Sequence, residues 1–137
     1  MTETIFDLHI SLIITTPKEI EEITDFLGVE PTDFIKKGQS RSKVIPKATE
    51  NRWIFTNKHR NLKEIGCTIS DFFNEFSDLP KKVGTLGGDT KASIRLSVIS
   101  DFAQIGFCLS PQDLELLCKI NIPFEISVLS WGEADAQ

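Results

Sequence analysis

The sequence predicts an α+β fold, with a mainly antiparallel five-stranded sheet and about three helices packed on one face. The first observation is the alternation of apolar and polar residues typical of half-buried strands, clearest at 5–15, 91–99 and 123–129. The second is a hydroxyl residue followed by proline, Thr16-Pro17 and Ser110-Pro111, ahead of an amphipathic segment. This repeated phrase suggests pseudo-duplicated strand-helix units, although hydroxyl-Pro-x-acid is also simply a common helix start.

The first half of the chain is expected to run strand, helix, connection, strand. The strand at 5–15 leads into a helix at 18–27, whose apolar residues recur at i, i+3 and i+7. Gly28 is the natural residue to end that helix. A polar and basic connection follows at 34–46, and a strand is expected at 52–56.

The second half begins with a predicted helix at 62–76, where six apolar residues recur at helical spacing. Pro80 can open one further turn. The alternating segments 91–99 and 104–109 are then expected to form a hairpin, because Asp101 and the residues after it turn the chain back.

A last helix is predicted at 111–120, followed by a strand at 123–129. Ser110 is a good N-cap, and Asp113 completes the spacing of a capping box. The expected apolar stripe of this helix consists of Leu114, Leu117 and Cys118.

Length and composition indicate one globular domain at 1–131 with a flexible tail at 132–137. The chain has 137 residues, 40% of them hydrophobic, and ten phenylalanines. No stretch resembles a signal peptide or is long enough to span a membrane, so we expect a cytoplasmic protein. Cys67, Cys108 and Cys118 lack ligand-like spacing, and we expect reduced, unreactive thiols, with Cys108 and Cys118 buried.

Charge is distributed unevenly along the chain. Residues 36–63 contain nine basic residues and one acid, Glu50, for a net charge of +8, which leaves −13 for the remainder of a chain of net charge −5. Acidic residues gather on the first predicted helix. Like charges clustered in sequence usually mark no more than a solvated face.

Several short sequence segments along the chain resemble those of a known family. They are the Ile20–Pro31 segment, Lys37-Gly38, Trp53 on a strand, and Leu109-Ser110 before the last helix. On these residues, and over about 6–131, the chain resembles a bacterial family described as domain of unknown function 4279. The resemblance implies no catalytic residue or cofactor. Proteins similar to it are small and stand alone, a profile shared with immunity proteins of toxin systems.

The residues themselves favour no catalytic or metal site. His9 and His59 lie outside any Cys or carboxylate cluster of useful spacing. No Gly-x-Ser-x-Gly or Cys-His signature supplies a nucleophile beside a base. The glycine-rich segment 84–89 precedes a strand instead of a helix, which is wrong for a phosphate loop. We therefore expect a chain that is not an enzyme and carries no cofactor or metal.

The favoured hypothesis is a non-catalytic protein-binding module, of immunity or inhibitor type, that neutralises a basic partner such as a bacterial toxin. Glu19, Glu22 and Asp25 lie three residues apart on the first helix and share its exposed side. Trp131 is the candidate apolar anchor, although a tryptophan that caps the core fits equally well. No membrane partner is expected, and the protein is expected to be a monomer or weak dimer.

The alternative is a site for a phosphate-bearing ligand or single-stranded nucleic acid on the basic segment 36–63. Lys36, Lys37 and Arg41 would follow the phosphates while Trp53 stacks a base. Trp53 alternates with polar residues, however, which is typical of a core position. Nucleic acid is therefore the less favoured partner.

Overall fold

The computed structural model describes residues 6–40, 43–44, 46–59, 65–100 and 108–130. Along these residues the chain forms five strands and four helices. Their bounds are β1 (Phe6–Thr16), α1 (Ile20–Leu27), β2 (Asp33–Ile35), β3 (Asn51–His59), α2 (Ile65–Asn74), α3 (Leu79–Gly84), β4 (Lys91–Ser100), α4 (Pro111–Ile120) and β5 (Phe124–Ser130).

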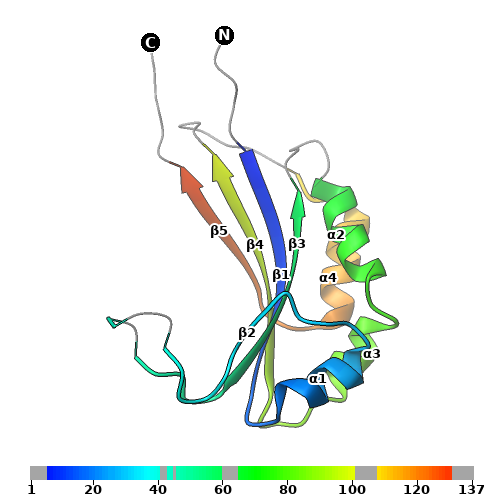
Figure 1. Ribbon diagram of the computed structural model, residues 1–137. Coiled ribbons are helices and arrows are strands. Elements are labelled where there is room, and N and C mark those ends of the chain that lie inside the picture. The colour runs from blue at the N-terminus through cyan, green and yellow to red at the C-terminus, as the bar shows by residue number, and fades with distance from the viewer. Residues whose placement is uncertain (1–5, 41–42, 45, 60–64, 101–107, 131–137) are drawn as a thin grey trace.

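The five strands form one sheet in the order β2-β3-β1-β4-β5. β1 is central and pairs antiparallel with both β3 and β4, whereas β4 and β5 run parallel. All four helices lie on the same face of the sheet (Figure 1). The predicted α+β fold with a mainly antiparallel sheet is thus confirmed, and α3 makes the helices four instead of about three. None of the helices in the described ranges is long and apolar enough to cross a membrane.

The core lies between the sheet and the helices, and it follows from the alternation of apolar and polar residues along β1. Alternate positions of β1 are fully buried, namely Leu8, Ile10, Leu12 and Ile14. Ile14 lies opposite Trp53 of β3, and Leu12 lies opposite Ile94 of β4. Because side chains alternate between the faces of a strand, this register puts the buried apolar residues of all three strands on the helix-covered face.

α1 packs through the apolar stripe that its sequence predicts. Ile20, Ile23 and Leu27 are buried. Gly28 ends the helix in the left-handed region, with φ 74°, and its amide donates to the carbonyl of Thr24 at 2.8 Å. Glycine suits this position because it has no Cβ to clash there.

α4 begins with the predicted capping box. The Ser110 side chain accepts from the Asp113 amide, and the Asp113 side chain accepts from the Ser110 amide. The predicted apolar stripe is wrong in two of three positions, because Leu114 and Cys118 are exposed. The buried residues of α4 are Asp113 and Ile120, and Leu116 and Leu117 pack partly buried against the core.

The cysteine prediction is also wrong in part. Cys108 and Cys118 are free, as expected, but both are exposed and not buried. The side chain of Cys67 lies outside the described part of the structure.

The predicted hairpin of 91–99 with 104–109 does not form along β4. β4 pairs with β1 on one edge, and its residues Ile94–Ser100 pair with β5 on the other. Both edges are therefore occupied. Cys108 and Leu109 are not in a strand, and residues 104–107 lie outside the described ranges. The sheet still has five strands because it contains β2, a strand of only three residues that was not predicted.

The two hydroxyl-Pro motifs have different structural roles. Ser110 caps α4 directly, whereas α1 starts three residues after Pro17 with Glu19 at its N-cap and no side-chain cap hydrogen bond. Thr16 instead accepts from the Lys18 amide at 3.1 Å. The strands that follow the two helices also differ. β2 follows α1 and pairs antiparallel with β3, whereas β5 follows α4 and pairs parallel with β4.

Candidate functional site

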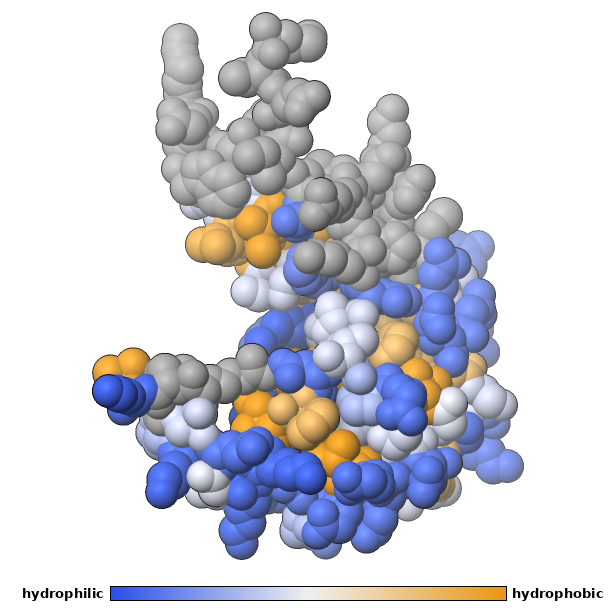
Figure 2. Space-filling model, in the orientation of Figure 1, coloured by the Kyte–Doolittle hydropathy of each residue, from blue (hydrophilic) through white to orange (hydrophobic). Residues whose placement is uncertain are grey.

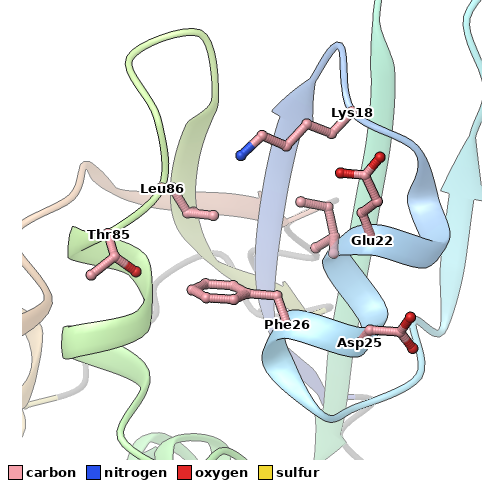
Figure 3. A pocket seen from close by; sticks show the side chains of 7 residues that line it. Lys18, Glu22, Asp25, Phe26, Thr85 and Leu86 are labelled. Atoms are coloured by element: carbon pink, nitrogen blue, oxygen red, sulfur yellow. The ribbon is translucent and has the colours of Figure 1, made fainter.

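A hollow of about 370 Å³ lies between α1 and the segment that follows α3. Its floor includes Ile23 of the core, and Figure 3 shows the side chains around it. The rim consists of Lys18, Glu22, Asp25, Phe26, Thr85 and Leu86.

The apolar part of the rim is formed by Phe26 and Leu86. Phe26 is 41% exposed, and its ring points from α1 toward Leu86 (Figure 3). Glu22 lies one helical turn before Phe26 and therefore on the same side of α1. The carboxylate of Asp25 points away from the Phe26 ring (Figure 3). The rim thus combines an exposed aromatic ring with carboxylates on its outer side.

Lys18 enters the rim from the loop between β1 and α1, and a buried asparagine holds that loop. The Asn51 side chain donates to the Lys18 carbonyl at 2.7 Å and accepts from the Lys37 amide at 2.8 Å. Asn51 is 9% exposed. Buried amide groups of this kind fix local geometry because both of their polar atoms need partners. Asn51 therefore connects the rim of the hollow to the start of the β2–β3 connection.

A second hollow, of about 210 Å³, lies on the other side of α1. Asp25 lines both hollows, and Phe34 of β2, which is 46% exposed, lines the second. The carboxylates of Glu21 and Glu30 also contribute to it. The exposed side of α1 is thus acidic and has a partly exposed phenylalanine at each flank.

The residues predicted to form an acidic site lie close together along α1, but the predicted apolar anchor is not among the described residues. Glu19 at the N-cap of α1 and Glu22 and Asp25 within the helix are all exposed, and the latter two line the first hollow. Trp131 lies outside the described residues. The apolar residue beside the carboxylates is Phe26, which sequence reasoning missed. Its signal was available, because Phe26 is an aromatic residue outside the apolar stripe of the helix.

The predicted basic site is only partly assembled. Lys36 and Lys37 are exposed, and Arg41 lies outside the described residues. Trp53 is fully buried, and its indole Nε1 donates to Thr24 Oγ1 at 3.1 Å. The Trp53 ring therefore presents no face to a ligand.

The exposed lysines belong to the connection between β2 and β3, which we call the arm (residues 36–40, 43–44 and 46–50). The arm projects from the body of the protein (Figure 1). It is held as a hairpin by hydrogen bonds from the Gly38 amide to the Ala48 carbonyl and from the Ala48 amide to the Gln39 carbonyl. At its base, Lys36 Nζ lies 5.9 Å from the centroid of the Phe34 ring.

Within the described ranges, no group of three or more His, Cys, Asp or Glu side chains is placed to hold a metal ion.

Comparison with known proteins identifies a family that matches this chain. A family model described as "Domain of unknown function (DUF4279)" matches residues 6–131. No curated protein and no solved structure matches the chain.

Proposed function

The chain belongs to the DUF4279 family of domains of unknown function, and we propose that it is a non-catalytic protein-binding module that neutralises a basic partner, such as a bacterial toxin domain. The observation that carries this proposal is the position of the partly exposed Phe26 beside Glu22 and Asp25 at the rim of a hollow. An apolar anchor bordered by charged groups is the usual arrangement at the centre and rim of a protein interface.

The proposed contact has two parts with different physical roles. Carboxylates on α1 attract a basic surface and orient it during approach, which raises the association rate. An apolar side chain of the partner then fills the hollow against Phe26 and Leu86, which slows dissociation. This division predicts that the acids control the association rate and its salt dependence, whereas Phe26 controls the dissociation rate.

The partner is to be identified by pull-down with the wild-type protein from the source cell, with attention to basic proteins encoded nearby. Binding kinetics are then measured with the triple variant Glu19→Lys, Glu22→Lys and Asp25→Lys. We expect its association rate at low salt to fall by about tenfold or more, with a flatter salt dependence. Phe26→Ala should mainly raise the dissociation rate.

A matched control reverses three exposed acids elsewhere. They are Asp71→Lys on α2, Glu75→Lys directly after α2, and Glu115→Lys on α4. This variant has the same net charge as the α1 triple variant, so it separates a local contact from a global charge effect. If the two variants slow association equally, α1 is not the binding surface. If a small molecule co-purifies and no protein does, the protein-binding proposal fails.

A second candidate function is binding of a phosphate-bearing ligand or single-stranded nucleic acid by the arm. The observation that favours it is the cluster of exposed lysines beside Phe34, an exposed aromatic ring at the base of the arm. Phe34 would take the stacking role first expected of Trp53. The exposed lysines of the arm are Lys36, Lys37, Lys43 and Lys47.

This second function is tested by titrating single- and double-stranded oligonucleotides at several salt concentrations. Binding by the arm should weaken steeply with salt, because phosphate contacts release counterions. The double variant Lys36→Glu and Lys37→Glu should abolish this binding. The same charge change at the exposed Lys81 of α3 and Lys119 of α4 should have a smaller effect. Absence of binding at low salt removes this candidate.

A further inference from the structure

The two edges of the sheet differ in how they are protected from pairing with another strand. β2 forms one edge, is only three residues long, and is followed directly by Lys36 and Lys37. Short strands and lysines are common devices that prevent edge-to-edge association. β5 forms the other edge and has seven residues, and no strand of the described ranges pairs with its outer side.

β5 also carries exposed apolar side chains. Ile126, Val128 and Leu129 are 45%, 54% and 60% exposed. In Figure 2, apolar surface lies at the upper left, where Figure 1 places the end of β5. Glu125 is the only charged residue of the strand, and it forms an ion pair with Arg95 of the neighbouring β4. The edge therefore lacks the lysine, proline and free charge that would keep another strand away.

We propose that β5 pairs antiparallel with β5 of a second copy of this chain, so that the two sheets join across a two-fold axis. The strand is self-complementary when the axis passes beside Ser127. Ile126 then lies opposite Val128 of the second copy, so apolar side chains meet on one face. Glu125 lies opposite Leu129, so no like charges meet.

Charge favours a second copy over other strands as the partner of this edge. Glu125 is neutralised within its own chain by Arg95, so the edge offers no net charge to select a charged peptide. A neutral, apolar strand fits best, and β5 itself is such a strand. One strand pair is small beside a standard interface of roughly 1,600 Å². The dimer is therefore weak and depends on protein concentration.

The test measures molecular mass by sedimentation velocity from low to high micromolar protein. The wild type should shift from monomer to dimer across this range. Val128→Lys should remain a monomer, because it places a charge at the centre of the apolar contact. The matched control is Val44→Lys on the arm, where the side chain is 91% exposed, and it should dimerise like the wild type.

Hydrogen exchange of the wild type provides a second measurement that does not depend on a folded variant. Amides in β5 should become more protected as concentration rises, while amides in the arm should not change. A wild type that stays monomeric overturns the proposal. So does a folded Val128→Lys variant that still dimerises, or a Val44→Lys variant that loses the dimer equally.

Discussion

The indole Nε1 of Trp53 donates a hydrogen bond to Thr24 Oγ1 at 3.1 Å, which joins the middle of β3 to α1. Trp53 is fully buried and Thr24 is half-buried, so the donor of this bond is shielded from water. Ile23, the residue before Thr24, is buried against the core. The bond and this packing together fix the rotation of α1, and the opposite side of the helix then presents its carboxylates and Phe26 to solvent.

Replacing Thr24 with Val should therefore destabilise the protein. The substitution keeps the shape but leaves the Trp53 indole N–H buried without its acceptor, at a cost of about 1–3 kcal/mol. Urea unfolding followed by circular dichroism measures the change. Thr49→Val, at an exposed position of the arm, is the control and should leave the free energy of unfolding nearly unchanged.

Removal of the cap of α4 should have a smaller effect. Ser110→Ala deletes the side-chain acceptor of the Asp113 amide and should cost about 1 kcal/mol of stability. The matched control, Ser77→Ala, removes an exposed hydroxyl that caps no helix. Thermal unfolding of the two variants compares them directly, and equal melting temperatures would show that the capping box does not stabilise α4.

Asn51→Ala should loosen the connection between the arm and the loop before α1. The variant leaves the Lys37 amide without its acceptor and the Lys18 carbonyl without its donor, and should cost about 1–3 kcal/mol. Hydrogen exchange should show faster exchange of the Lys37 amide than in the wild type. Asn74→Ala, at an exposed position, should leave that amide unaffected.

Cys108 and Cys118 should react with a thiol reagent in the native protein, because both are free and exposed. Labelling followed by peptide mass spectrometry should find both modified at rates close to those in unfolded protein. Cys118→Ser should remove one fast-reacting thiol and no more. Slow labelling of both residues until the protein unfolds would contradict their exposure.

The sequence predicted the elements with strong periodicity and failed where pairing is non-local. β1 and β4 were placed to within about one residue, because one buried face imposes a period of two. The hairpin after β4 was wrong because the partner of an edge depends on the whole sheet, and β5 reaches that edge by a crossover through α4. β2 was missed because three residues are too few to show a period.

The candidate site was predicted in part for similar reasons. Helical spacing alone places Glu22 and Asp25 on the exposed side of α1, so their common location followed from the sequence. The hollow beside them depends on where the segment that carries Leu86 lies relative to α1. The spacing of residues within a helix does not reveal that position. The burial of Trp53 could be anticipated from its alternation with polar neighbours, and the structure shows it in contact with Thr24.

The central position of β1 has a consequence for how the chain folds during synthesis. β1 is made before both of its partners, which begin only at Asn51 and Lys91. The edge of β1 that pairs with β4 therefore stays unpaired until Lys91 and the residues after it are made. Pairings so distant in sequence slow folding and expose the nascent chain to aggregation. A fragment that ends before Lys91 would keep one edge of β1 open, so we expect it to aggregate instead of folding.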